Sequence, residues 1–186
     1  MKLFYLFTAD RRFKCDLDIV AYSAYDPCVG PNDGYVRING RRVWEAGWCS
    51  AKPNLRGINT MILDPTDCSV VDQRRFDTWW NVTKAHDLIA YLEYIRMGAL
   101  VIGVTGDEPM RYLEPAFPRL RLAGVHVEDV KIRGSFAFVI QTGYPENTMF
   151  VKSTTNARRT VQLTTSISGK LAVCAPVSSK TSLLVQ

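Results

Sequence analysis

The stretch that decides the fold is Ala99-Leu100-Val101-Ile102-Gly103-Val104, six consecutive residues without a polar side chain. A strand that alternates between apolar and polar residues has one solvated face, whereas a strand covered on both faces is apolar throughout. The run therefore predicts a buried strand, and the neighbouring segments must supply the layers that cover it.

An amphipathic helix is predicted directly before this strand. Four apolar residues of the segment 83–97 repeat with the spacing of a helix, 3.6 residues per turn: Leu88, Ile89, Leu92 and Ile95. Thr83 is a suitable N-terminal cap, and Gly98 is well placed to end the helix near Met97. A second helix is expected over residues 113–123, where Pro115 and Pro118 fit only in the first turn.

The remaining regular segments are predicted as strands. Asn39-Gly40 indicates a tight turn within residues 35–44, and Ser168-Gly169-Lys170 is expected to turn the alternating segment that begins at Val161 into a C-terminal β-hairpin. The expected strands are residues 17–25, 35–44, 58–63, 69–76, 99–104, 135–140, 161–167 and 171–177. This order predicts a mixed α/β (or α+β) sandwich of sheets with two helices and the hairpin as an extension.

Composition excludes several classes of protein. The 186 residues are 47% hydrophobic, yet no apolar run approaches the roughly 18–20 residues that a membrane span needs. Residues 1–146 carry 18 acidic and 18 basic side chains, and the last 40 residues add five basic side chains and no acidic one. A nucleic-acid-binding protein usually has a denser basic face with interleaved aromatic residues, so we expect no nucleic-acid partner.

No catalytic or cofactor-binding motif is present. The chain lacks G-x-S-x-G, G-x-x-x-x-G-K, G-x-G-x-x-G and H-E-x-x-H, and it has only two histidines, His86 and His126. We therefore predict no enzymatic activity, no cofactor and no metal. The tryptophans form two pairs, Trp44/Trp48 and Trp79/Trp80, which suit core packing or, alternatively, a face for stacking a sugar.

The cysteines and one sequon indicate secretion. Cys15, Cys28, Cys49, Cys68 and Cys174 contain no C-x-x-C pair, which argues against structural zinc and for disulfides with one thiol left over. Asn81-Val82-Thr83 is a glycosylation sequon. Residues 1–14 read either as a strand or as a short signal-like segment, since Leu3–Phe7 is apolar but shorter than a signal-peptide core.

Four ordered motifs between Arg56 and Gly143 resemble the ILEI/PANDER family, also called the GG domain. In chain order the motifs are Arg56-Gly57-Ile58-Asn59; Val70 to Phe76-Asp77-Thr78; Leu88 to Gly98 with Leu100-Val101-Ile102; and Ile132-Arg133-Gly134-Ser135-Phe136-Ala137-Phe138-Val139. The last resembles the family's W-R-D-[ST]-W-A-F-[VI], with Ile132 and Phe136 in place of tryptophans and Gly134 in place of the acid. These departures remove an aromatic platform and a carboxylate.

The resemblance implies a β-β-α sandwich, secretion, disulfides and no catalysis. In the related stem domain of the O-mannose N-acetylglucosaminyltransferase the domain binds sugar, and its contact residues correspond to Asp107 and Arg133. An aspartate accepts hydrogen bonds from sugar hydroxyls and a guanidinium donates them; the alternative is a salt bridge between the two. The resemblance also implies a Cys15–Cys174 disulfide, with a further pair among Cys28, Cys49 and Cys68.

Three functions remain open at this stage. The first is a secreted, non-enzymatic, lectin-like module that binds a glycan or glycoprotein, the second a cytokine-like signalling protein with a cell-surface receptor, and the third an accessory domain of a larger secreted enzyme or matrix protein. We expect an N-terminal segment at 1–14, the ILEI-like domain at 15–146, and a basic Ser/Thr-rich hairpin extension at 147–186 that offers a contact for homo-oligomers.

Overall fold

The computed structural model describes residues 8–23, 34–47, 55–153 and 160–173. Within these ranges the chain forms nine strands and two short α-helices, the second preceded by a 3₁₀ turn (η1, Glu114–Ala116). The strands are β1 (Thr8–Ala21), β2 (Gly34–Ile38), β3 (Arg41–Ala46), β4 (Gly57–Leu63), β5 (Val70–Phe76), β6 (Leu100–Gly106), β7 (Phe136–Gln141), β8 (Tyr144–Lys152) and β9 (Val161–Val173). The helices are α1 (Thr83–Tyr94) and α2 (Phe117–Leu122).

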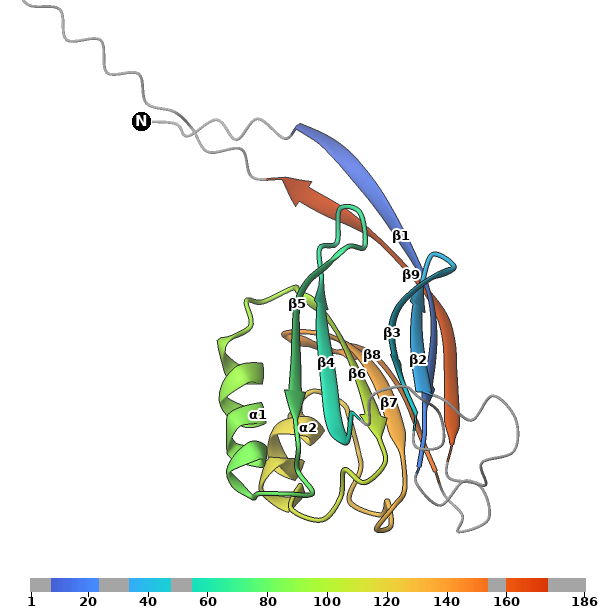
Figure 1. Cartoon of the computed structure of the whole chain (residues 1–186). Helices are drawn as coiled ribbons and strands as arrows, with labels where there is room; N and C mark the ends of the chain where they lie inside the picture. Colours follow the sequence, from blue (N-terminus) through green and yellow to red (C-terminus); the bar gives the residue numbers. More distant parts are fainter. Residues whose placement is uncertain (1–7, 24–33, 48–54, 154–159, 174–186) are drawn as a thin grey trace, which may run out of the picture.

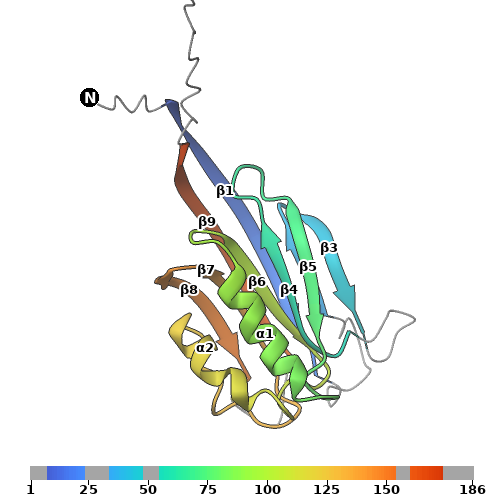
Figure 2. The same cartoon turned by 90° about the vertical axis from the view of Figure 1, so that its left-hand side faces the viewer.

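The strands build two antiparallel sheets that face each other (Figure 1). One sheet has the order β3-β2-β1-β9 and the other the order β5-β4-β6-β7-β8. Helices α1 and α2 lie on the face of the five-stranded sheet that is turned away from the four-stranded sheet (Figure 2). The expected mixed α/β class with a β-β-α sandwich is therefore wrong: the described chain is mostly β, and its helices are two short peripheral segments.

Strand β6 is buried on both faces, as its apolar sequence predicts, and lies in the middle of its sheet. Ile102 and Val104 belong to the apolar cluster between the sheets, and Val101 belongs to the cluster between this sheet and the helices. Gly103 leaves room for the ring of its cross-strand neighbour Phe138, because a Cβ at Gly103 would lie 2.0 Å from that ring.

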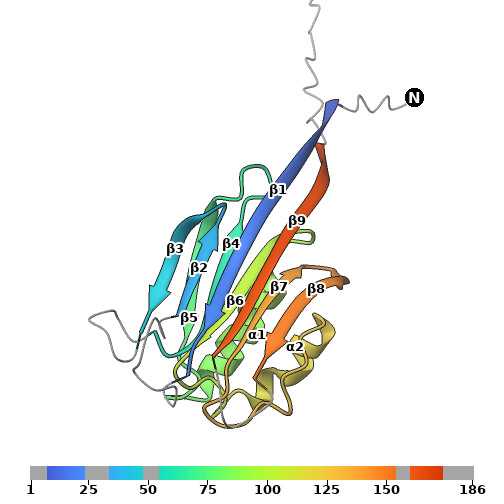
Figure 3. The ribbon, with the colours of Figure 1, turned by 90° about the vertical axis from the view of Figure 1, so that its right-hand side faces the viewer.

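The C-terminal hairpin is not formed, because β9 continues through Gly169 without turning. It pairs with β1 from Val161 to Val173, and the two strands run side by side past the ends of β2 and β3 (Figure 3). The long antiparallel partner explains the difference, since a glycine within a ladder needs no turn when backbone pairing continues on both sides of it. Strand β9, and not a hairpin, is thus the edge of this sheet.

Both helices are shorter than the sequence predicts. Helix α1 ends at Tyr94, since Ile95 is already extended. Gly98 does not end the helix: it adopts a positive φ in the following turn, where its N–H donates to the carbonyl of Thr142. Thr83 does not cap the start of this helix with its side chain; instead, its backbone N–H donates to Oδ1 of Asn81. The second helix splits into the 3₁₀ turn and the six residues of α2.

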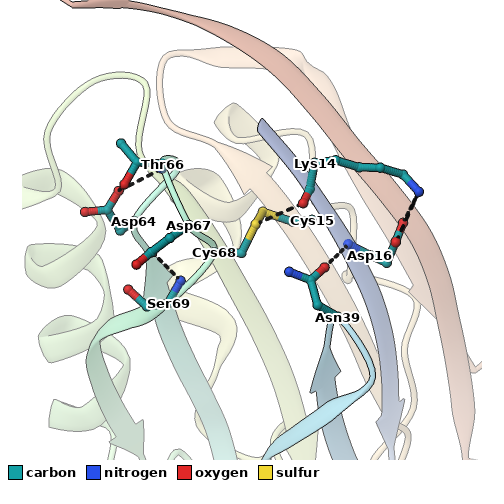
Figure 4. Close-up of a disulfide and its surroundings, with 9 residues drawn as sticks. All are labelled: Lys14, Cys15, Asp16, Asn39, Asp64, Thr66, Asp67, Cys68 and Ser69. Atoms are coloured by element: carbon teal, nitrogen blue, oxygen red, sulfur yellow. Dashed lines mark hydrogen bonds and ion pairs between the residues drawn. A yellow bond between two sulfur atoms is a disulfide. The ribbon is translucent and has the colours of Figure 1, made fainter. Parts of the chain in front are cut away.

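One disulfide joins the two sheets within the described residues, between Cys15 on β1 and Cys68 in the turn before β5 (Figure 4). The expected Cys15–Cys174 pair is therefore wrong, and Cys174, Cys28 and Cys49 lie outside the described residues. Cys15 points inward from β1 into the core between the sheets, where Cys68 also lies. Only the packing of the sheets brings these two cysteines within reach.

Candidate functional site

Four strand ends meet at one end of the five-stranded sheet, the lower end in Figure 1. Strands β5 and β6 end there and strands β4 and β7 begin there, because all the neighbouring pairs are antiparallel. Gly57 pairs with Gly106, which places Arg56 and Asp107 just beyond the sheet, and Asp77 follows β5 beside them. Residues of four different loops are thereby brought onto one rim.

Asp107 and Arg133 meet on this rim. Nη1 of Arg133 donates to Oδ1 of Asp107 over 3.0 Å, although the two residues are 26 positions apart in the chain. Both residues have positive φ, 57° for Asp107 and 65° for Arg133. A left-handed conformation costs a non-glycine residue roughly 1–2 kcal/mol, and such strain persists only where the surroundings hold it. The fold therefore fixes both the pair and the direction of its side chains.

Glu108 anchors the same loop from below and has no exposed side-chain surface. Its carboxylate accepts the backbone N–H of Met110 over 2.6 Å and the backbone N–H of Arg133, and the Nε of Arg133 lies 3.8 Å away. Burial raises the pKa of Glu108, while the two N–H donors and the Arg133 charge act against that rise. Glu108 thus ties the loop after β6 to the loop before β7.

The indole of Trp79 is the centre of an arginine cluster. The guanidinium carbons of Arg111, Arg133 and Arg56 lie 4.3, 5.1 and 5.8 Å from its ring centroid. Contacts of this length are cation–π interactions, which hold flexible arginine side chains in place. The backbone around Trp79 is itself fixed, because the buried hydroxyl of Thr78 donates to the carbonyl of Pro109 over 2.6 Å.

Arg56 is held by Asp77 in a two-point interaction. Its Nε and Nη2 donate to the two carboxylate oxygens of Asp77 over 3.0 and 2.9 Å. These hydrogen bonds raise the pKa of the Arg56 guanidinium despite its partial burial, and the charges of Asp77 and Asp107 add to the effect. Arg75 also approaches Asp77, at 3.6 Å.

We call the residues Arg56, Asp77, Trp79, Asp107, Glu108, Arg111 and Arg133 the arginine rim. Of the two sugar-contact residues predicted from the resemblance, the structure brings Asp107 and Arg133 together, but their exposure differs. The side chain of Arg133 is 23% exposed and that of Asp107 only 3%. A ligand at this rim would therefore meet Arg133 first, and Asp107 lies behind it.

Other residues singled out in the sequence lie elsewhere. The predicted glycosylation residue Asn81 is exposed, His86 and His126 are exposed, and Trp44 is buried in the core between the sheets. Trp48 lies outside the described residues. Among the residues that the structure describes, no three histidine, cysteine or acidic side chains are grouped to hold a metal ion.

Sequence reasoning missed most of the arginine rim, although part of the signal was present. Arg56 and Asp77 belong to two of the motifs that carry the family resemblance, but nothing in those motifs indicates that the two side chains pair. Trp79 was considered only as one of two adjacent tryptophans. Nothing in the sequence marked Arg111, whose neighbours in space come from another loop.

The fold and the rim define an antiparallel β-sandwich domain with a charged, aromatic-centred loop edge. The family model for ILEI, the interleukin-like EMT inducer, matches residues 56–144, which confirms the resemblance that the motifs of this stretch indicated. All seven residues of the arginine rim lie within the match. No curated protein matches the chain. The ILEI family is of the secreted type, and no helix among the described residues is long and apolar enough to span a membrane.

Proposed function

We propose that the chain is a secreted, non-enzymatic module that binds a carbohydrate at the arginine rim. The observation that carries the proposal is the convergence of Arg133 and Asp107, both held in left-handed backbone conformations at the accessible end of the sheet. Protein backbones keep such strain mainly at functional sites. The ILEI domain supports a module of the secreted type, and sugar binding is the finer step that we add.

The two residues have different roles in this proposal. The guanidinium of Arg133 is partly exposed and donates to hydroxyl or acetamide oxygens of the sugar. Asp107 is nearly buried, so we assign it the positioning of Arg133 and not direct contact with the ligand. A few directional hydrogen bonds on a small rim give weak binding, with a Kd on the order of millimolar, or about −4 kcal/mol.

The experiment is an NMR titration of the ¹⁵N-labelled protein with a panel of methyl glycosides. We compare the wild type with Arg133→Lys, which keeps a positive charge beside Asp107 but removes the planar fork of donors. Arg133→Ala is a poorer choice, because it removes one partner of an ion pair with the nearly buried Asp107, and breaking a buried pair typically destabilises a protein by about 3–5 kcal/mol.

We expect sugar-dependent shifts at residues of the rim in the wild type and their loss in Arg133→Lys. The control is Arg121→Lys, since Arg121 belongs to α2 and pairs with Glu128 away from the rim. Binding that is unchanged in Arg133→Lys contradicts the proposal, as does a panel in which no sugar shifts any rim resonance.

A further inference from the structure

In the arginine rim the carboxylates are more deeply buried than the guanidinium groups. Its three carboxylates are the least exposed groups, with side chains that are 16% exposed for Asp77, 3% for Asp107 and 0% for Glu108. The arginines that pair with them are more open, 27% exposed for Arg56 and 23% for Arg133. The negative charges thus lie beneath the positive ones, and a molecule approaching from solvent meets guanidinium groups.

Arg111 adds a cation that has no carboxylate partner among the residues that the structure describes. It is exposed, and within the part of the chain that the structure describes its contacts are with two aromatic rings, Trp79 at 4.3 Å and Tyr112 at 5.1 Å. None of the ion pairs among the described residues involves it, whereas Arg56 and Arg133 each have a carboxylate partner within 3.0 Å. Stacking against Trp79 fixes the plane of the guanidinium while its N–H edge stays in solvent.

The carboxylates of the arginine rim are withdrawn from solvent or shared. Glu108 has no exposed side-chain surface and lies beneath Arg133. Asp77 is shared between Arg56 and Arg75, so one carboxylate serves two cations. The arginine rim therefore exposes its guanidinium groups to solvent more than its carboxylates, although the chain from residue 1 to residue 146 is electrically balanced.

We propose that the ligand of the arginine rim is an acidic sugar, whose anionic group is bound by Arg111 beside the hydroxyl contacts of Arg133. The inference rests on the carbohydrate-binding function proposed above and specifies its substrate class. A guanidinium accommodates a carboxylate or a sulfate through two parallel hydrogen bonds. Arg111 and Arg133 both lie against the indole of Trp79, which places the two guanidinium groups in the same part of the rim.

The test uses two sugars that differ in one group, methyl β-D-glucuronide and methyl β-D-glucoside. Both are titrated by NMR into the full chain as the wild type, Arg111→Gln and Arg74→Gln. Arg74 is the matched control, because it is also an exposed arginine that stacks on an aromatic ring, Tyr91 at 4.9 Å, but it lies on the edge strand β5. Glucose 6-sulfate forms a third arm, which separates a sulfate from a carboxylate as the anion.

We expect the wild type to bind an acidic sugar about two- to fivefold more tightly than the glucoside, with a preference that weakens as salt is raised. Arg111→Gln should lose the preference, so that the acidic and neutral sugars bind it with equal affinity, and Arg74→Gln should behave as the wild type. Tighter binding of either the glucuronide or the sulfate supports the proposal, and the comparison identifies the anion.

Two results would overturn it. Equal binding of the acidic and neutral sugars by the wild type removes the preference for an anion but leaves sugar binding at Arg133 intact. If sodium acetate or sodium sulfate competes as well as the acidic sugars do, the rim is a general anion site and the proposal of an acidic sugar as its ligand fails. The failure of the broader function looks different, because in that case neither sugar shifts any resonance of the rim.

Discussion

The disulfide between Cys15 and Cys68 joins the two sheets in the fold and is expected to stabilise the protein mainly by restricting the unfolded chain. The cysteines are separated by 53 positions. In the chain-entropy model a cross-link that closes a loop of this length stabilises a protein by about 4 kcal/mol at 25 °C. Cys15→Ala/Cys68→Ala should therefore lower the free energy of unfolding by about that amount, and by slightly more because both side chains are buried in the core.

Urea unfolding followed by tryptophan fluorescence measures this change. With a slope of about 2 kcal/mol per molar urea, the loss corresponds to a midpoint that falls by about 2 M. Wild-type protein that has been reduced and kept reduced should move in the same direction, since the bond is removed without deleting a side chain. Cys174→Ala is the control, and non-reducing peptide mapping of this variant should still find the Cys15–Cys68 disulfide.

The reasoning fails if reduction leaves the urea midpoint within about 0.3 M of the oxidised protein. It also fails if non-reducing peptide mapping links Cys15 to Cys174, because the pairing then follows the family resemblance and not the packing of the sheets shown in Figure 4. A double variant that unfolds completely is still informative, because the reduced wild type measures the same bond.

Three further predictions concern packing, protonation and modification. Gly103→Ala should destabilise the protein by about 1–3 kcal/mol, since its Cβ would overlap the ring of Phe138, and Phe138→Leu in the same chain should recover part of the loss in thermal unfolding. Because burial raises the native pKa of Glu108, the stability that this group contributes is full below about pH 4.5 and is lost as the pH rises through the native value. Glu108→Gln lacks the titrating group, so the free energy of unfolding of the wild type should fall relative to that of the variant as the pH rises. Curves of stability against pH that stay parallel for the two proteins would contradict the assignment. Asn81 is exposed at the start of α1, so protein secreted from eukaryotic cells should lose mass on treatment with an N-glycosidase, and Asn81→Gln should not; equal masses before and after treatment would refute glycosylation.

Local patterns in the sequence determined the strands at the centre of the domain. The apolar run at β6 needed cover on both faces, and the structure confirms a central strand with a cluster of apolar side chains on each side. Asn39-Gly40 also turned the chain where expected, because both residues adopt the positive φ that a tight turn requires. In each case neighbours in the sequence carried the information.

The ends of elements depended on partners that are distant in the chain. Gly169 resembles a turn in the sequence, yet β1 supplies a continuous ladder and keeps the chain extended through it. The second helix was shortened for a related reason, since periodicity marks which residues face the core but not where a 3₁₀ turn replaces the helix. At Gly169, backbone pairing across a long separation in the chain overrode the local preference for a turn.

The arginine rim shows the same division between sequence and tertiary structure. The motifs pointed to Asp107 and Arg133, because the residue types suit hydrogen bonding and the resemblance fixed their positions. Antiparallel strands that end together bring these two residues into contact, bury Asp107 beneath Arg133 and place Trp79 among three arginines. Only the tertiary structure decides how exposed each charged side chain is, since a sequence does not state which charges lie nearer to solvent.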